Sequence, residues 1–334
     1  MDGRWLRTRG AILLACCALL IPPVGCEAEA LAPLRVGINP WPGYEFLYLA
    51  DEIGIYEDLG LEVRIVEFDS LGDVRRAFER GQIDVMGCTL IELLAARRDT
   101  DREPTVIFVP DYSNGGDVIL ARDSIDGITG LRGKRVGVEL GSLNIFVLAR
   151  ALEKNGLTIG DVELVAHPQL EMPDAFAAGE LDAVVTYPPF LFEIEKQGTT
   201  RRVFSTRDIP REVIDVIVAD ARTIRERPED LVLLLRGFHR AFVATRERPQ
   251  ECLPIMASRE GISPEEFRQV ISEEVRIVGL DEQESYLCAG GEVDREIRAV
   301  DRVLHAVGQL SGPSKVDGAT VPHLARQAWE AERP

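Results

Sequence analysis

Arg35-Val36-Gly37-Ile38 recurs as Arg135-Val136-Gly137-Val138, one hundred residues further along the chain. A second stretch, Phe78-x-x-Gly81-x-Ile83-Asp84-Val85, recurs ninety-eight residues later as Phe176-x-x-Gly179-x-Leu181-Asp182-Ala183. Between the paired stretches, each copy places a predicted helix and then a predicted strand, at 61–65 in one and at 162–165 in the other. Two matches at nearly equal offsets predict that one supersecondary unit occurs twice and forms two similar lobes.

Each copy contains a glycine and an aspartate for which a local role is sufficient. Gly81 and Gly179 each follow a predicted helix, where glycine adopts the left-handed conformation without steric cost. Asp84 and Asp182 then open predicted strands. We interpret both aspartates as capping or turn residues rather than as ligand contacts.

From Leu34 onward, short apolar runs alternate with amphipathic stretches, which is typical of strand and helix units that build a largely parallel sheet. The predicted strands are 34–38, 61–68, 83–88 and 106–109, and the predicted helices between them are 44–55 and 73–80. A β-branched run at 213–218 is predicted to be extended.

The chain after residue 218 is predicted to be mostly helical, over 230–245, 249–257, 264–274 and 293–307. Such a helical tail cannot form a third sheet lobe. We expect it to pack on the first lobe, with two strands near 112–120 and 213–219 crossing between the lobes.

The composition is that of a globular protein: 334 residues with 46% hydrophobic and 28% charged side chains can bury one large core or two modest ones. The formal charge is −18, and removal of residues 1–25, with one aspartate and three arginines, leaves −20. Such an acidic surface disfavours binding to nucleic acid or to anionic membranes.

The first residues have the pattern of an export signal, because Arg4, Arg7 and Arg9 precede an apolar run at 11–21 that is too short to span a bilayer. Gly25-Cys26 follows, as in bacterial lipoprotein signals, and Cys26 would then be the lipidated first residue. Pro23 stands where that pattern prefers leucine. An ordinary secretory signal that is cut nearby is the alternative.

Apart from Cys26, three cysteines lie beyond the signal: Cys88, Cys252 and Cys288. They form no CxxC motif and have no histidines at metal-ligand spacing, so we expect no metal site. An oxidising compartment permits a disulfide between Cys252 and Cys288. Three buried thiols are the alternative.

The stretch Trp41-Pro42-Gly43-Tyr44-Glu45-x-Leu47-Tyr48-Leu49-Ala50 is followed by Gly81-Gln82-Ile83-Asp84, by Asp111–Asp117, by Leu131–Glu139 and by Leu181–Phe190. In these stretches the chain resembles the periplasmic substrate-binding proteins of the nitrate, sulfonate, taurine and thiamine-precursor transporters, over roughly residues 34–275. The resemblance implies the type II periplasmic-binding fold. In that α/β fold, two lobes of mixed sheets flanked by helices hold a ligand between them.

The resemblance implies a domain plan and a function. Residues 1–25 would be the signal peptide, 34–116 with 217–330 the discontinuous first lobe, and 117–216 the second. The chain would be the solute-binding component of an ABC importer, capturing a small nitrogen- or sulfur-containing organic solute and delivering it to the permease. We expect a periplasmic or cell-surface monomer, anchored through Cys26, without a cofactor or a nucleic-acid partner.

Candidate ligand contacts follow from where strands end, because ligands of open parallel sheets meet the loops at the carboxyl ends of strands. The thirteen candidates are Trp41, Tyr44, Glu45, Thr89, Asn114, Asp117, Glu139, Gly141, Ser142, Asn144, Thr186, Tyr187 and Asp215. Trp41 could stack on a flat or cationic ligand, and Gly141-Ser142 could donate hydrogen bonds. Core packing is the alternative for Trp41 and Tyr44, and N-capping is the alternative for Ser142.

The candidates include four acids, Glu45, Asp117, Glu139 and Asp215, but no arginine or lysine. These acids would repel a doubly charged anion such as sulfate unless they pair elsewhere. We therefore predict a neutral, zwitterionic or cationic nitrogen-containing ligand. Helix capping or bracing of the hinge is the alternative role for most of the acids.

Two other classes of function stay open. The same fold hosts small-molecule enzymes, including a thiamine-pyrimidine synthase of yeasts. However, the four histidines, His167, His239, His305 and His323, are scattered, and no HExxH, GxSxG, Walker or dinucleotide motif occurs. We therefore expect no catalytic residues. A ligand sensor that docks on a membrane receptor is the other alternative.

Overall fold

The computed structural model describes residues 32–198 and 200–333. The predicted export signal (1–25) and the predicted lipidation site, Cys26, lie outside the described residues. Over the described ranges, no helix has both the length and the apolar content that crossing a bilayer requires.

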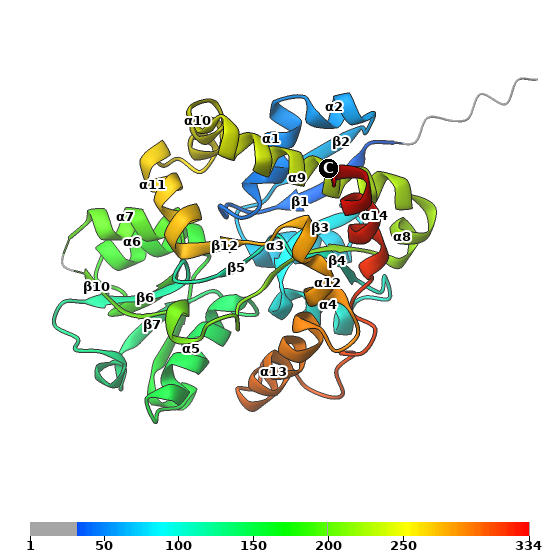
Figure 1. The fold of residues 1–334 in the computed structure, drawn as a ribbon. Coiled ribbons are helices and arrows are strands. Elements are labelled where there is room, and N and C mark those ends of the chain that lie inside the picture. The colour runs from blue at the N-terminus through cyan, green and yellow to red at the C-terminus, as the bar shows by residue number, and fades with distance from the viewer. Residues whose placement is uncertain (1–31, 199, 334) are drawn as a thin grey trace, which may run out of the picture. The chain divides into compact units, whose positions relative to one another are not determined.

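The first sheet has five strands in the order β2-β1-β3-β11-β4 (Figure 1). Its strands are β1 (Leu34–Ile38), β2 (Val63–Glu67), β3 (Val85–Thr89), β4 (Thr105–Phe108) and β11 (Asp215–Ala219). β1 pairs in parallel with β2 and β3, whereas β11 runs antiparallel between β3 and β4. The strand that returns last along the chain is thus built into the middle of the first sheet.

The second sheet repeats this arrangement. Its order is β10-β6-β9-β7-β8, formed by β6 (Val118–Arg122), β7 (Arg135–Val138), β8 (Glu163–Ala166), β9 (Ala183–Thr186) and β10 (Thr200–Ser205). In the order β8-β7-β9-β6-β10, the second sheet corresponds strand by strand to β2-β1-β3-β11-β4 of the first sheet. β6 takes the position of β11, and each of these two strands runs antiparallel to both of its neighbours. The sequence repeat therefore corresponds to a repeated sheet topology.

The repeated residues make the same local bonds in both sheets. Asp84 accepts hydrogen bonds from the backbone N–H and the guanidinium of Arg35, and Asp182 accepts the equivalent bonds from Arg135. Both aspartates are structural, as predicted, but each binds the start of a neighbouring strand and does not serve as a cap or turn residue. Gly81 and Gly179 have φ of 72° and 80°, which favours glycine.

Helices flank both sheets. They are α1 (Glu45–Glu52), α2 (Ile55–Leu59), α3 (Leu71–Glu79), α4 (Leu90–Asp99), α5 (Leu143–Lys154), α6 (Met172–Ala177), α7 (Phe190–Lys196), α8 (Ala221–Glu226), α9 (Pro228–Glu247), α10 (Pro249–Arg259), α11 (Pro264–Gln269), α12 (Gln283–Leu287), α13 (Glu292–Ala306) and α14 (Pro322–Glu332). The single helix predicted over 44–55 is wrong, because Gly54 has φ of 76° and separates α1 from α2. In the helix predicted over 264–274, the α-helical part ends at Gln269, and Val270–Glu274 form one π-helical turn.

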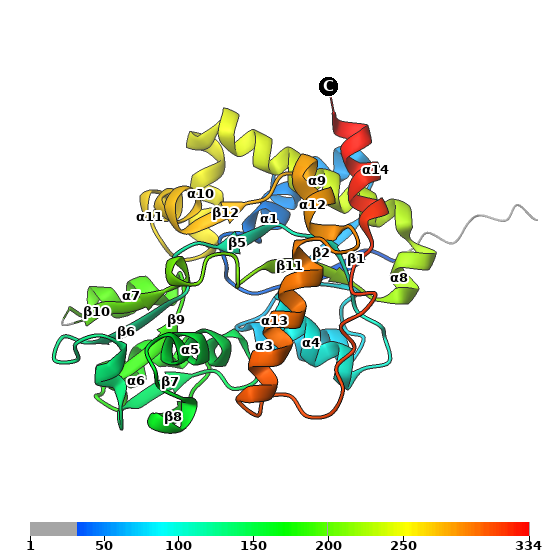
Figure 2. The same ribbon diagram turned by 60° about the horizontal axis from the view of Figure 1, so that its bottom comes forward.

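The C-terminal segment packs on the first sheet, as predicted. α9 packs against α1 and α2, and α14 packs against α9 (Figure 1). α13 packs against α4 (Figure 2) and also contacts α5. The segment contributes a strand that the sequence did not predict: β12 (Val275–Ile277) pairs antiparallel with β5 (Asp111–Ser113).

The three cysteines in the described part of the chain are free thiols. Cys88 and Cys252 are buried and Cys288 is partly exposed, so the alternative of unpaired cysteines fits the structure better than a disulfide. Within the described residues, no group of three or more His, Cys, Asp or Glu side chains is arranged to hold a metal ion.

Candidate functional site

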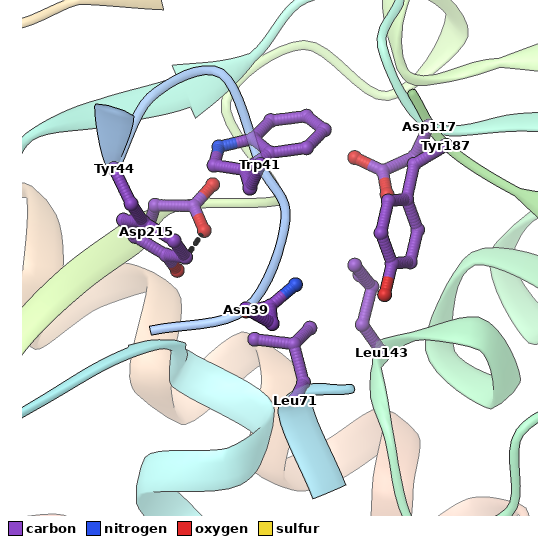
Figure 3. Close-up of a pocket in the computed structure, with 8 residues that line it drawn as sticks. All are labelled: Asn39, Trp41, Tyr44, Leu71, Asp117, Leu143, Tyr187 and Asp215. Atoms are coloured by element: carbon purple, nitrogen blue, oxygen red, sulfur yellow. Dashed lines mark hydrogen bonds between the residues drawn. The ribbon is translucent and has the colours of Figure 1, made fainter. Parts of the chain in front are cut away.

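A small cavity lies where strand ends of both sheets meet. Eight residues line it: Asn39, Trp41, Tyr44, Leu71, Asp117, Leu143, Tyr187 and Asp215 (Figure 3). The space open to the centre of a water molecule is about 10 Å³, within about 210 Å³ that protein atoms leave empty. This is room for roughly one water molecule, well below the size of a cavity for a drug-sized ligand.

The repeated topology brings the lining residues together. Asn39 and Trp41 follow β1 at its carboxyl end in the first sheet, and Tyr187 follows β9, the counterpart of β3, at its carboxyl end in the second sheet. Asp117 directly precedes β6 and Asp215 begins β11, the antiparallel strand of each sheet. The cavity is therefore built by both sheets and by both segments that cross between them.

Trp41 is 4% exposed and is held in place by a buried hydrogen bond. Its indole Nε1–H donates to Asp111 Oδ1 at 3.1 Å. A Cβ at Gly43 would collide with the Asp111 carboxyl, so glycine is required for this close approach. The loop thus turns the indole toward the cavity while satisfying its polar atom.

Beside Trp41, the Tyr44 hydroxyl donates a hydrogen bond to Asp215 Oδ1 (Figure 3). Burial raises the pKa of Asp215 well above its ordinary value, and the nearby Asp111 raises it further. Burial also raises the pKa of Asp111, to about 7, against the lowering effects of Trp41 and Asp215. Burial and the neighbouring acid thus both favour the protonated form of Asp215.

Asp117 is 1% exposed, and neither of its carboxyl oxygens has a hydrogen-bond partner among the described residues. Burial, with a smaller contribution from Glu92, raises the pKa of Asp117 to about 7. The Ser113 hydroxyl lies close enough to lower this pKa in part, but it makes no hydrogen bond to the carboxyl oxygens. Figure 3 shows the Asp117 carboxyl turned toward the Trp41 ring.

Two aromatic rings form adjoining walls. Trp41 and Tyr187 meet edge to face, with ring centroids 6.0 Å apart and planes at 81°. Tyr187 in turn meets Phe190, with centroids 5.8 Å apart, which braces its ring from behind. Nearly perpendicular rings beside a carboxyl group suit a cationic group, because ring faces carry negative electrostatic potential.

Five of the thirteen predicted contacts line the cavity: Trp41, Tyr44, Asp117, Tyr187 and Asp215. Glu45 lies elsewhere, fully buried in an ion pair with Arg259. Thr89 caps α4 by accepting a hydrogen bond from the Ile91 N–H at 3.2 Å.

The remaining predicted contacts also lie outside the lining. Thr186 Oγ1 accepts a hydrogen bond from Gln169 at 2.6 Å, and the Asn144 side chain accepts one from the Glu139 N–H at 2.9 Å. The Asn114 N–H donates to the Glu274 carbonyl at 2.8 Å. Gly141 is exposed with φ of 71°.

Ser142 occupies the N-cap position of α5 but does not cap the helix with its hydroxyl. Instead, Glu92 on α4 reaches the start of α5, where its Oε1 accepts a hydrogen bond from the Leu143 N–H at 2.9 Å. The first turn of α5, where ligand contacts from Ser142 and Asn144 were predicted, therefore already has an acceptor from the protein.

Three lining residues were not among the sequence candidates: Asn39, Leu71 and Leu143. Asn39 directly follows β1, and its position after a strand was a usable signal. Leu71 and Leu143 begin helices, and apolar residues at such positions look no different from core residues. Asp111 and Glu92, which support the site from behind, were likewise missed.

Comparisons with known proteins agree with this geometry. A family model described as NMT1/THI5 like matches residues 41–252. A protein of Brucella abortus strain 2308, named a candidate binding protein, is 22% identical over 231 residues, which are 67% of this chain and 70% of the relative.

Solved structures of the same fold include binding proteins and an enzyme. The alkanesulfonate-binding protein SsuA of Xanthomonas axonopodis pv. citri, bound to MOPS, has a TM-score of 0.74 at 18% identity, covering 87% of this chain and 99% of that chain. The desulfurization enzyme DSZB has a TM-score of 0.63 at 16% identity, covering 90% of this chain and 100% of that one. The predicted periplasmic-binding-protein fold is thus confirmed.

Proposed function

This chain belongs to the NMT1/THI5-like family, and we propose that it is the solute-binding component of an ABC importer, working in the periplasm or at the cell surface. It captures a small organic solute between its two sheets and delivers the solute unaltered to a permease. It acts as a monomer, and Cys26 anchors it to a membrane.

The cavity carries this proposal. It is enclosed by strand ends of both sheets, is lined by aromatic rings that include Trp41 and Tyr187, and contains a buried carboxyl that has no hydrogen-bond partner among the described residues. Buried polar atoms are normally hydrogen-bonded, so a cluster of unpartnered ones around a cavity favours a bound molecule as the missing partner. Trp41, Tyr44, Asp117, Tyr187 and Asp215 are the proposed contacts.

The cavity's small size requires that the protein opens to admit a solute. We propose that residues 34–116 with 217–330 form one lobe and residues 117–216 the other, and that they separate at the two crossing segments. Closure around the solute excludes water and strengthens each polar contact in the cavity.

A thermal-shift screen of amines, pyrimidines, taurine, sulfonates and nitrate tests the binding role. A solute at about one hundred times its Kd stabilises the protein by about 2.7 kcal/mol, which raises Tm by several degrees. Trp41→Ala should abolish the shift, whereas Trp329→Ala, which removes a tryptophan from α14, should keep it. A protein that no solute from the screen or from a cell extract stabilises would contradict the proposal.

Two further measurements separate transport from the alternative functions. Deletion of the gene should abolish cellular uptake of the identified solute, and the wild-type gene but not Trp41→Ala should restore it. Mass spectrometry of the solute recovered from the protein should give its original mass. A changed mass would favour an enzyme instead, and unaffected uptake would favour a sensor.

A further inference from the structure

Three of the hydrogen-bond donors that face the cavity are already used within the protein, which leaves the second N–H of the Asn39 amide and the Tyr187 hydroxyl. The Trp41 indole N–H donates to Asp111, and the Tyr44 hydroxyl donates to Asp215. The Asn39 side-chain amide donates to the Pro40 carbonyl at 3.0 Å. In the described part of the chain, no arginine or lysine lines the cavity.

The acceptors, in contrast, are free. Asn39 Oδ1 and both carboxyl oxygens of Asp117 are buried without a hydrogen-bond partner among residues 32–198 and 200–333. An ionised carboxyl group can only accept hydrogen bonds. The Tyr187 hydroxyl is also without a described partner, and it can donate or accept.

The helix N-termini beside the cavity, which could otherwise bind an anion, are capped by the protein. Ser70 Oγ accepts from the Asp73 N–H of α3 at 3.2 Å, Thr89 caps α4, and Glu92 accepts from Leu143 of α5. A sulfonate or nitrate brings only acceptors. It would meet the unpartnered oxygens of Asp117 and Asn39, and it would find no cationic side chain among the described lining residues. Asp111, Asp215 and Glu92 add further acidic groups close by.

We propose that the cavity selects a small organic ammonium ion that carries N–H groups, with Asp117 as its counter-ion. The ion's N–H groups donate to Asp117 and Asn39, and its carbon atoms pack against Trp41 and Tyr187. A zwitterion fits less well, because its anionic end would find only the Tyr187 hydroxyl and one Asn39 N–H as donors, with no cationic side chain among the described lining residues. This inference rests on the proposed function and names the solute class of the same cavity.

Calorimetry with matched probes at about pH 8 tests the inference. The probes are primary ammonium ions from methylammonium to benzylammonium, each compared with the alcohol of the same carbon skeleton. Tetramethylammonium supplies charge without N–H, taurine is the zwitterion, and methanesulfonate is the anion. We expect the best ammonium ion to bind at least about tenfold more tightly than each comparison probe, as for a charge-assisted hydrogen bond in a buried site.

Two substitutions locate the effect. Asp117→Asn should weaken ammonium binding by about 10- to 100-fold, because it replaces the counter-ion with a neutral amide of the same shape. Asp182→Asn makes the same chemical change at the opposite end of β9 from Tyr187 and should leave binding unchanged. The unliganded Asp117→Asn protein should have a Tm no lower than the wild type, which shows that the fold is retained.

The outcomes distinguish this inference from the proposed function. Binding of an alcohol, taurine, tetramethylammonium or methanesulfonate as tightly as any ammonium ion would overturn the inference and leave the binding role intact. Ammonium binding that survives Asp117→Asn would also overturn it. If no ammonium ion binds but another solute stabilises the protein, the solute class is wrong; if nothing binds, the proposed function is wrong as well.

Discussion

At the scale of single residues, Asp117 has opposite effects on folding and on binding. A buried aspartate without partners destabilises the folded protein, and the same lack of partners leaves its full hydrogen-bonding capacity for a ligand. Binding sites commonly sacrifice stability in this way. Asp117 was a sequence candidate, but its burial and its unpartnered oxygens became apparent only in the folded chain.

The affinity for an ammonium ion should increase with pH. Burial raises the pKa of unliganded Asp117 to about 7. The groups that face it are Glu92 from α4, Asp111 and Ser113 from β5, and Asp215 from β11. A bound cation favours the ionised carboxyl and lowers its pKa, so protons compete with the ligand below about pH 7.

If one proton on the carboxyl competes with the ligand, the Kd for the ammonium ion should rise about tenfold for each pH unit below pH 7. The Kd should be constant above about pH 8, where the carboxyl is ionised. Calorimetry with one ammonium probe over this range measures the slope. Asp182→Asn should reproduce it, and Asp117→Asn should flatten it. An affinity equal at about pH 5.5 and pH 8 would show that no cavity carboxyl serves as counter-ion.

Cys26 offers a separate residue-scale prediction. If Gly25-Cys26 is a lipoprotein signal, the full-length chain made in a bacterium should incorporate labelled fatty acid and sediment with membranes. Cys26→Ser should abolish both properties, whereas Cys252→Ser, at a buried thiol, should leave both unchanged. A secreted wild-type protein without lipid would favour the ordinary secretory signal.

At the scale of elements, the two sheets use one local device twice. Arg35 and Asp84 join the start of β1 to the start of β3, and Arg135 and Asp182 join β7 to β9 in the same way. Burial raises the pKa of Asp84, but the hydrogen bonds from Arg35 outweigh burial, and the pKa of Asp84 lies below its ordinary value. The hydrogen bonds from Arg135 lower the pKa of Asp182 in the same way. These contributions to stability are present above the aspartate's unfolded pKa and are lost as the pH falls through the folded value.

Asp84→Ala and Asp182→Ala should each lower the free energy of unfolding by about 1–2 kcal/mol, since both arginines are partly exposed. The two costs should add in the double variant, because the pairs lie in different sheets and share no partner. Urea unfolding at neutral pH measures all three values. A double variant that costs much less than the sum would show that the two pairs do not stabilise their sheets independently.

At the scale of the whole molecule, Glu92 connects the two halves. Its Oε2 accepts from the Thr89 N–H at 3.1 Å within the cap of α4, which packs on the first sheet. Its Oε1 accepts from Leu143 at the start of α5, which packs on the second sheet. We interpret this carboxyl as a latch that holds the proposed lobes together around the cavity.

Glu92→Ala should therefore favour opening of the unliganded protein. Hydrogen exchange at the first turn of α5 should accelerate by about 10- to 100-fold, as expected for a lost hydrogen bond to a charged group. Small-angle scattering should give a larger radius of gyration. Ser263→Ala, which removes the cap hydroxyl of α11 and leaves the bonds of Glu92 intact, is the control. Equal acceleration at α5 in both variants would contradict a specific role for Glu92.

The amino-acid order alone predicted the duplicated strand and helix units, the helical C-terminal segment, the glycine turns and the residues that follow the strands. These features depend on periodicity, backbone conformation and spacing, which act between near neighbours in the chain. Trp41 and Asp117 were within reach of this reasoning because they follow or border strands. The division of one predicted helix at Gly54 and the pairing of β12 with β5 were not.

Tertiary structure decided which side chains share the cavity and in which state. Tyr44 meets Asp215 across 171 positions of sequence, and Trp41 meets Asp111 across 70. Such contacts occupy some hydrogen-bond donors of the cavity and leave some acceptors without partners. Other candidates have structural roles outside the cavity: Glu45 forms an ion pair with Arg259, and Thr89 caps α4. Burial and pairing depend on all packed neighbours at once, so the sequence predicts which residues lie near the site but not its charge or its hydrogen-bonding capacity.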